Sequence, residues 1–371
     1  MEPKKYEYID SLRGIAVLMV ILVHIGNMLL PQDEIQYHYP EWLCRIISAG
    51  RYGVQLFFIV SALTLFMSHN NRKGETQPVK KFFIRRFFRI APMYYLAIIY
   101  FTFDQFIGFD FSNLDFSLIP LKALLSSILF VNSLFPFYAN LYVPGGWSVS
   151  VEFIFYLFVP FLCSKISNVN KSISFAAIAF VVGAIISSIA CYYLIPDTVQ
   201  QNSDDGFAVF NFFVQFPVFT LGFLCYRILN NNEEPIRRST LALMLAAFVF
   251  FFFFMPIPKH LLFSLILLIL VVIQARKPFK ILSNKVLAKV GKVSFSMYLV
   301  HFAIIHALNN IGFNYLFGVN DIYTSLLNFV LMYLLVSLIT YLVSSITYKY
   351  IEVKGQNIGR QIIKTMDKKE S

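Results

Sequence analysis

The feature that most constrains this chain is a series of about ten apolar stretches, each near the length of about 20 residues that a helix needs to cross a bilayer core. The 371-residue sequence is 58% hydrophobic and only 14% charged, far more apolar than a water-soluble domain. The sequence therefore predicts an all-α polytopic membrane protein. The predicted spans lie near 11–30, 52–68, 90–107, 147–163, 173–195, 208–229, 240–255, 260–275, 293–308 and 323–347.

The distribution of basic residues predicts the orientation of the chain. The sequence holds 31 Lys and Arg against 20 Asp and Glu, a net charge of +11. Few of these cations fall in the predicted external segments, namely Arg45, Arg51, Lys122 and Lys259. Because cytoplasmic loops are enriched in Lys and Arg, we expect both termini in the cytoplasm, with a short tail from about residue 348. This asymmetry accounts for the positive charge, so membrane lipid is the expected partner and nucleic acid is not.

The organisation of the chain is otherwise simple. The sequence shows no internal repeat, long linker or metal-ligand spacing, so residues 1–371 are expected to form one membrane domain without a metal site. Residues 109–146 form a long external connection whose apolar piece is short for a span, which we interpret as a re-entrant or interfacial helix. Residues 78–90 are expected to form a cytoplasmic helix with Pro78 in its first turn.

The first predicted span carries an ionisable residue toward each end. Arg13 and His24 are eleven residues apart, which on a helix places them about 16 Å apart along the axis and only about 20° apart around it. Ionisable residues inside a membrane are costly and usually face a cavity or a partner, so the pair is a candidate functional site. In the alternative interpretation, Arg13 is a snorkelling anchor and His24 is a core histidine bonded to a neighbouring helix.

A cluster of arginines follows the second span. Arg85, Arg86 and Arg89 have the three- and four-residue spacings that bring side chains together on one helix surface. The planar guanidinium suits phosphate, so the cluster predicts a site for a phosphate-rich cytoplasmic ligand. The interleaved phenylalanines at 82, 83, 87 and 88 leave open an amphipathic helix held at anionic headgroups.

The segment "GGWSVSVEFIFYLFVP" at 145–160 places a carboxylate inside the membrane. Its two glycines permit a sharp turn, and Trp147 suits the outer interface. Glu152 then lies about 8 Å from the outer end of its helix, and His24 lies about 9 Å from the outer end of the first span. The two side chains are therefore expected at the same depth in the membrane. A carboxylate and an imidazole at one depth suit a general base and its orienting partner. A buried Glu152 paired structurally with an Arg or Tyr is the alternative.

A second histidine lies in "GKVSFSMYLVHFAIIH" at 291–306, where Ser294, Tyr298 and His301 share one helical face. His301 is interpreted first as a packing or orienting residue, with a direct chemical role as the alternative. Residues expected to contact the substrate are Trp147, Ser150, Tyr298 and His301.

These segments together resemble the acyltransferase family 3 of integral membrane acyltransferases. The resemblance rests on "YIDSLRGIAVLMVILVH", "GVQLFFIVSALTL", "RRFFRIAPMYY", "WSVSVEFIFYLFVP", "GKVSFSMYLVH" and "YIEVKGQ", which occur in the family's order over about the whole chain. The chain departs from the family pattern at Ala62, where a Gly is usual, and at Val353 and Lys354, which replace a proline-containing run. The resemblance implies a ten-helix enzyme of the cell membrane. Such an enzyme takes an acyl group, usually acetyl from cytoplasmic acetyl-CoA, to a hydroxyl of a sugar, polysaccharide or glycolipid outside.

The resemblance also implies roles for particular residues. Arg13 and His24 match the family's functional pair, Arg86 and Arg89 match its arginines, and Glu152 matches its "WS-x3-E" acid. In the mechanism we expect, Arg86 and Arg89, together with Arg85 and Arg13, hold the phosphates of CoA. Acetyl-CoA is then a cosubstrate that binds and leaves, and no cofactor is permanently bound. His24, oriented by Glu152, acts as general base on the acceptor hydroxyl or carries the acyl group covalently.

Two other functions are compatible with the same residues. Intramembrane His and Glu with Arg at the mouth also suit a proton-coupled transporter of a sugar or lipid-linked saccharide, although the paired halves common in transporters are not evident. A non-catalytic membrane scaffold is the third possibility, and it predicts that no single ionisable residue matters. The sequence leaves the acceptor, the choice between acetyl and succinyl, and the oligomeric state open.

Overall fold

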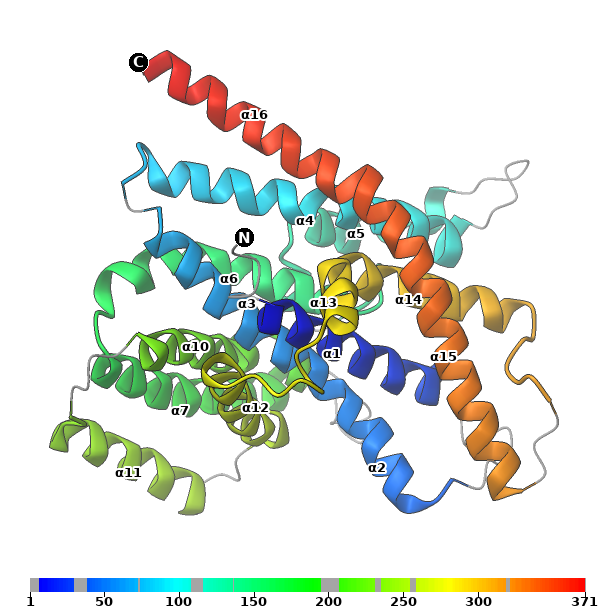
Figure 1. The fold of residues 1–371 in the computed structure, drawn as a ribbon, viewed down its shortest axis with the longest axis horizontal. Helices are drawn as coiled ribbons and strands as arrows, with labels where there is room; N and C mark the ends of the chain where they lie inside the picture. Colours follow the sequence, from blue (N-terminus) through cyan, green and yellow to red (C-terminus); the bar gives the residue numbers. More distant parts are fainter. Residues whose placement is uncertain are drawn as a thin grey trace. The chain divides into compact units, whose positions relative to one another are not determined.

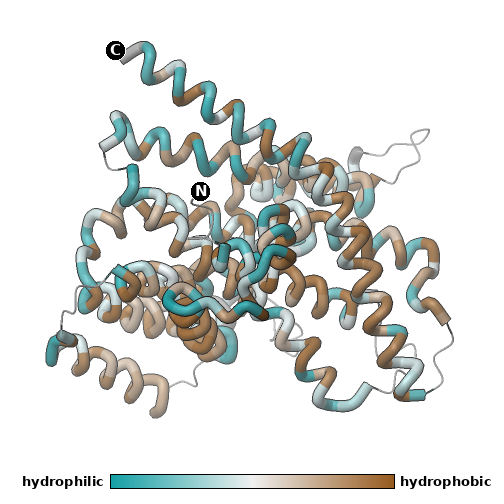
Figure 2. The backbone as a smooth tube through the Cα atoms, in the orientation of Figure 1, coloured by the Kyte–Doolittle hydropathy of each residue, from teal (hydrophilic) through white to brown (hydrophobic). Residues whose placement is uncertain are grey.

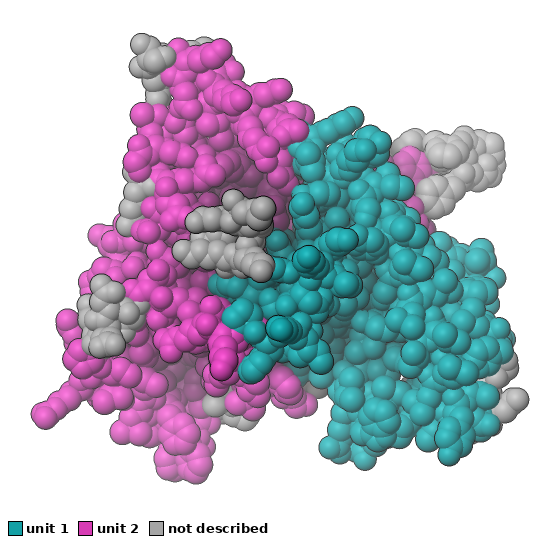
Figure 3. Space-filling view, viewed as in Figure 1, with its two compact units in different colours: residues 1–57, 92–94, 278–355 teal, residues 58–91, 95–277, 356–371 magenta. Residues whose placement is uncertain are grey.

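The structure is a computed structural model that describes residues 7–29, 39–72, 74–107, 116–135, 137–194, 207–230, 235–253, 258–317 and 321–370. Within these ranges every regular element is a helix (Figure 1), which confirms the all-α prediction. The chain divides by contacts into two compact units, each assembled from separate segments of sequence (Figure 3). Unit 1 comprises Met1–Phe57, Pro92–Tyr94 and Pro278–Gly355, and unit 2 comprises Phe58–Ala91, Tyr95–Lys277 and Gln356–Ser371. The expectation of one domain stays a prediction.

Unit 1 is built around the first helix. Its elements are α1 (Glu7–His24), η2 (Ile25–Leu29), α2 (Glu41–Ala49), η3 (Gly50–Tyr52), the start of α3 (Gly53–Asn70), α13 (Lys285–Lys292), α14 (Ser294–Asn310), α15 (Ile322–Thr347) and η7 (Tyr348–Glu352). The side chain of Asp321 begins α15 by accepting hydrogen bonds from the backbone N–H groups of Tyr323 and Thr324. Such a cap satisfies donors that the first turn of a helix leaves unpaired.

Unit 2 holds the remaining helices. They are the rest of α3, most of α4 (Pro78–Thr102), η4 (Phe103–Ile107), η5 (Phe116–Leu118), α5 (Leu121–Ile128), η6 (Asn132–Leu134), α6 (Gly146–Lys165), α7 (Val169–Leu194), α9 (Phe207–Phe210), α10 (Phe212–Leu229), α11 (Arg238–Phe253), α12 (Lys259–Arg276) and most of α16 (Val353–Glu370). Hydrophobic residues run along α11, whereas hydrophilic and hydrophobic residues alternate along α16 (Figure 2). The amphipathic pattern of α16 is that of a helix lying on a surface rather than crossing a bilayer.

Not every stretch predicted to span the membrane is matched, in the described part of the chain, by a helix that is long and apolar enough to cross it. Eight helices in the described part of the chain are long and apolar enough to cross a membrane, and the bent pair of α13 and α14, which meet at 73°, would be a ninth. The remaining predicted span, near 240–255, corresponds to α11. This helix has 16 described residues, fewer than the 18 that we require of a helix that crosses the membrane. A multi-span membrane protein is therefore supported, while the exact count and the side on which the termini lie stay predictions.

One predicted helix end is wrong. The helix predicted over 78–90 begins at Pro78 as expected but does not end at residue 90, because α4 continues through Pro92 to Thr102; its cytoplasmic location stays a prediction. Membrane helices tolerate an internal proline since neighbouring groups satisfy the freed carbonyl. The predicted span at 323–347 matches α15, and the tail that follows it is also helical, since η7 joins α15 to α16 without a break. In the segment 109–146, α5 is the only α-helix among the described residues, and its re-entrant or interfacial placement stays a prediction.

Glycines let the backbones of unit 1 meet around α1. A Cβ atom on Gly291 of α13 would lie 1.7 Å from the carbonyl oxygen of Asp10, and one on Gly14 would lie 2.3 Å from that of Leu287. A Cβ on Gly53 would lie 2.4 Å from the carbonyl oxygen of Ala16. Small residues allow this close approach, which stabilises membrane helices through packing. The first helix, which carries Arg13 and His24, is thus fixed on two sides.

The core of unit 2 is aromatic. The rings of Phe58, Phe219 and Phe155 stack in sequence, with centroids 4.4 and 4.1 Å apart. A Cβ on Gly222 of α10 would lie 2.4 Å from the carbonyl oxygen of Ile59, so α10 and α3 also touch through their backbones. Aromatic pairs add stability beyond the area that they bury. This packing anchors α3 and α6, the helices that hold Ser61 and Glu152.

Candidate functional site

Two imidazoles meet in unit 1. His24 ends α1 and is half-buried, and His301 lies within α14 and is fully buried. Their ring centroids are 5.1 Å apart, and His24 Nδ1 lies 3.3 Å from His301 Nε2. Each Nδ1 also faces a carbonyl oxygen of its own helix, at 2.8 Å from Val20 for His24 and at 3.1 Å from Met297 for His301. The structure therefore brings together two site residues that the sequence placed in different motifs.

These contacts assign the protons on the two rings. A carbonyl oxygen only accepts hydrogen bonds, so in each neutral ring the proton belongs on Nδ1. His24 Nδ1–H is then shared between Val20 O and the lone pair of His301 Nε2. The lone pair of His24 consequently sits on Nε2. That nitrogen is the one able to take a proton from a bound hydroxyl.

Aromatic rings surround this histidine pair. Phe302 packs edge-on against His24 with centroids 4.5 Å apart, and it contacts His301 at 4.0 Å. Tyr298, predicted to contact substrate, is buried with its ring centroid 5.9 Å from that of His301. These rings restrict the orientation of both imidazoles, because a packed aromatic neighbour leaves few rotamers open. His301 thus lies where it can orient His24, and its role stays a prediction.

Arg13 lies on the same uninterrupted helix as His24. It is half-buried in α1, and the eleven residues between it and His24 correspond to about 16 Å of helix rise. The helix geometry on which the predicted pair depends is therefore present. The functional role of Arg13 stays a prediction.

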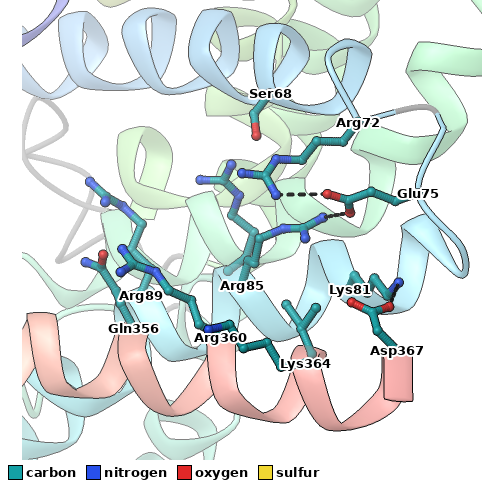
Figure 4. Close-up of a pocket in the computed structure, with 12 residues that line it drawn as sticks. Ser68, Arg72, Glu75, Lys81, Arg85, Arg89, Gln356, Arg360, Lys364 and Asp367 are labelled. Carbon is teal, nitrogen blue, oxygen red and sulfur yellow. Dashed lines mark hydrogen bonds and ion pairs between the residues drawn. The ribbon is translucent and has the colours of Figure 1, made fainter. Parts of the chain in front are cut away.

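The predicted arginine cluster lines a cavity in unit 2. This cavity has a volume of about 480 Å³ and is formed by residues of α3, α4 and α16 and of the turn between α3 and α4 (Figure 4). Small-molecule sites are commonly about 300–1,000 Å³. The charged residues that line it are Arg72, Glu75, Lys81, Arg85, Arg86, Arg89, Arg360, Lys364 and Asp367. We call it the arginine cavity.

Ion pairs within the arginine cavity occupy only some of its cations. Glu75 binds two arginines, with Arg72 Nη1 at 3.0 Å and Arg85 Nη2 at 2.9 Å, and Lys81 pairs with Asp367. Within the described ranges no ion pair involves the other lining cations. These are Arg86, Arg89, Arg360 and Lys364. The cavity therefore has a surplus of positive charge suited to an anion.

Arg86 is the most enclosed of these cations. Its guanidinium carbon lies 5.6 Å from the centroid of the Phe82 ring, a cation–π distance, and its Nε is buried without a hydrogen-bond partner. Glu152 and Tyr156 are near enough to interact electrostatically with it. A buried donor without a partner is costly, so this nitrogen has bonding capacity that a ligand or water can satisfy.

Glu152 has two hydroxyl partners in unit 2. Its carboxylate accepts hydrogen bonds from Ser61 and, at 2.8 Å, from the Tyr156 hydroxyl one helical turn further along. Glu152 is half-buried, and its contact with Tyr156 is of the kind that the alternative interpretation, a structural pairing with an Arg or Tyr, expects, while its role stays a prediction. The predicted pairing of Glu152 with His24 involves residues of different units and stays a prediction.

Trp147 and Ser150 at the start of α6 make internal contacts. The Trp147 ring stacks on Phe210 with centroids 4.6 Å apart. The Ser150 hydroxyl donates to the Phe130 carbonyl oxygen at 2.8 Å and lies 2.8 Å from the Ser133 hydroxyl. A hydroxyl used in this way holds the preceding loop in place. The prediction that both residues bind substrate is not tested by these contacts.

Besides Arg72, Glu75 and Lys81, the charged lining residues that the sequence reasoning missed lie on α16. Arg360 and Lys364 line the arginine cavity although neither was a candidate. A signal for them exists in the tail, where Gln356, Arg360, Ile363, Lys364 and Asp367 recur at the spacing of one helix face. Among the described residues, no group of three or more His, Cys, Asp or Glu is placed to hold a metal ion.

Comparison with known proteins gives the chemical class of the chain. A family model described as an acyltransferase domain, Acyl_transf_3, matches residues 6–349. A protein of Acidianus two-tailed virus named "Putative acetyltransferase ORF330" is 26% identical over 319 residues, which cover 82% of this chain and 84% of that protein. No solved structure matches the chain. The residues that the family model matches include His24, His301 and the arginines of α4, and they end before α16.

Proposed function

Since the chain belongs to the acyltransferase family Acyl_transf_3, we propose that it moves an acetyl group from cytoplasmic acetyl-CoA to a hydroxyl of an extracytoplasmic sugar, polysaccharide or glycolipid. The family makes the protein an acyltransferase, and its apolar helices make it a membrane protein. The donor, the acceptor and the cell membrane as its location are what we propose. The transporter and scaffold interpretations lack the support that the family gives to acyl transfer.

The single observation that carries the donor assignment is the surplus of cations in the arginine cavity. CoA bears a diphosphate and a phosphomonoester, and a phosphomonoester alone carries about −1.5 to −2 charges at pH 7. Arg86 and Arg89 supply forked donors whose geometry matches phosphate oxygens. We therefore assign the phosphate-bearing end of acetyl-CoA to this cavity.

The hydroxyl chemistry is assigned to His24. In the proposed step, His24 Nε2 takes the proton of the acceptor hydroxyl while its oxygen attacks the acetyl carbonyl carbon. The carbon–sulfur bond then breaks, and the CoA thiolate leaves and recovers the proton from the imidazolium. During the step His24 carries a positive charge, which its Nδ1–H shares with Val20 O and His301 Nε2. General base catalysis of this kind contributes about 10²- to 10⁴-fold.

A covalent route would use the same residue differently. In it the acetyl group first forms a bond to a His24 nitrogen as CoA leaves, and the acceptor hydroxyl attacks this acyl-imidazole afterwards. Incubation of the purified protein with radiolabelled acetyl-CoA, in the absence of acceptor, separates the two routes. Label on wild-type protein that His24→Ala abolishes indicates the covalent route, and its absence during active turnover indicates direct transfer.

The decisive experiment compares the polysaccharide of cells with and without the active protein. Cells producing the wild-type chain are expected to carry base-labile acetyl esters on a surface glycan, and cells producing His24→Ala at equal abundance are expected to lack them. His306→Ala is the matched control, because it removes an imidazole from the same helix as His301. Full acetylation by His24→Ala would refute the assignment. Uptake of a sugar without acetyl transfer would favour a transporter.

A further inference from the structure

The C-terminal helix α16 forms one wall of the arginine cavity. Gln356, Arg360, Ile363, Lys364 and Asp367 line the cavity from this helix, opposite residues of α3 and α4 (Figure 4). They recur every three or four residues and so share one face. Because α16 lies beyond residues 6–349, the family match says nothing about this wall.

Two contacts hold α16 against α4. Gly359 lies under Phe88, where a Cβ on the glycine would meet the phenylalanine Cβ at 3.0 Å. About two helical turns beyond it, Asp367 forms an ion pair with Lys81. Lys81 is buried and also donates to the Thr76 hydroxyl at 2.7 Å. A buried ammonium needs such partners, since an unpaired charge out of water is costly. The position of α16 is therefore specified by packing and by charge.

The two cations between these contacts are available to a ligand. Arg360 and Lys364 are exposed, and in the part of the chain that the structure describes neither takes part in an ion pair. Arg360 donates to the Asn357 side chain of its own helix at 3.1 Å, which leaves most of its five donors unused. Together with Arg86 and Arg89, they place in one cavity four cations that form no ion pair among the described residues. Like charges in one cavity repel each other, which is unfavourable. A bound multivalent anion attracts all of them and so offsets the repulsion.

We propose that Arg360 and Lys364 of α16 bind phosphate groups of acetyl-CoA, so that α16 is a second wall of the donor site facing Arg86 and Arg89. This inference rests on the proposed function, because it takes the donor from there. It adds a helix outside the family match to the binding site. The headgroup of an anionic lipid offers the same phosphate chemistry, and the test below separates these two sources.

The experiment measures acetyl-CoA binding to the full-length protein in detergent. A double variant, R360Q with K364Q, is expected to raise the Kd by roughly tenfold or more, because hydrogen bonds to charged groups are the strong ones. The variant R360K with K364R keeps both charges and is expected to retain most of the affinity. Lys368→Gln removes a charge from the same helix at a position that does not line the arginine cavity, and is expected to leave the Kd unchanged. Equal unfolding temperatures of all variants exclude a general loss of structure.

Three outcomes overturn the inference, and the first two leave the proposed function standing. An unchanged Kd in the R360Q/K364Q variant, with a Kd raised by Arg86→Gln and Arg89→Gln, refutes the α16 wall alone. Loss of binding to phosphatidylglycerol vesicles, but not to acetyl-CoA, assigns the two cations to lipid and also refutes it. Failure of the wild-type protein to bind acetyl-CoA refutes the proposed function, and the inference with it.

Discussion

Replacement of His301 by phenylalanine tests how the histidine pair works. The variant keeps an aromatic ring in the buried position but removes Nε2, the atom that accepts part of the His24 Nδ1–H hydrogen bond. If His24 becomes an imidazolium during transfer, the loss of this acceptor destabilises the transition state. The reaction should therefore slow without loss of acetyl-CoA binding.

The magnitude follows from the geometry of the bond. A hydrogen bond to a charged group contributes about 1.5–3 kcal/mol. The distance of 3.3 Å is longer than the usual charge-assisted range of about 2.7–2.9 Å, and the same proton also faces Val20 O at 2.8 Å. We therefore expect a cost at or just below the lower limit of this range, about 1–1.4 kcal/mol, which is about a five- to tenfold loss in kcat. Loss of His24 itself should cost about 10²-fold or more.

The assay is acetyl transfer in membrane vesicles at saturating acetyl-CoA, normalised to the amount of inserted protein. His301→Gln supplies a side-chain oxygen as acceptor and is expected to recover part of the rate, while His306→Phe is the control on the same helix. A loss in His301→Phe as large as that in His24→Ala would show that His301 is itself a catalytic group. An unchanged rate would reduce His301 to a packing residue.

Three further predictions follow from the packing and charge of the two units. Gly291→Ala puts a Cβ 1.7 Å from the Asp10 carbonyl oxygen, so α13 must move away from α1. Overpacking of this kind costs about 1–3 kcal/mol of stability, and we expect a lower unfolding temperature in detergent. An unfolding temperature equal to that of the wild type would show that α1 and α13 can move apart without loss of stability. Asp367→Asn removes the charged partner of buried Lys81, so the acetyl-CoA Kd should rise as α16 loosens; a Kd equal to wild type would show that packing at Gly359 suffices. Raising the salt concentration from about 0.1 M to 1 M shortens the Debye length from about 10 Å to 3 Å and should weaken acetyl-CoA binding, whereas salt-independent affinity would argue against a phosphate-binding cavity.

The sequence alone determined the features that depend on local spacing. Apolar stretches of bilayer length specify the all-α class, because a helix satisfies its own backbone wherever it lies in a membrane. The placement of Arg13 and His24 on one helix, and the convergence of Arg85, Arg86 and Arg89, follow from about 3.6 residues per turn. Helix ends were less well determined, since Pro92 lies inside α4 and η7 continues the chain into α16.

Only the tertiary structure decided which distant side chains meet. His24 and His301 are 277 residues apart in sequence, and Lys81 and Asp367 are 286 apart, so no periodicity within a single helix reports either contact. The proton assignment on His24 and the second wall of the arginine cavity both depend on such contacts. These contacts between distant residues depend on glycines that let helix backbones touch and on ion pairs that specify where a helix docks. Such interactions exist only once the separate segments have packed.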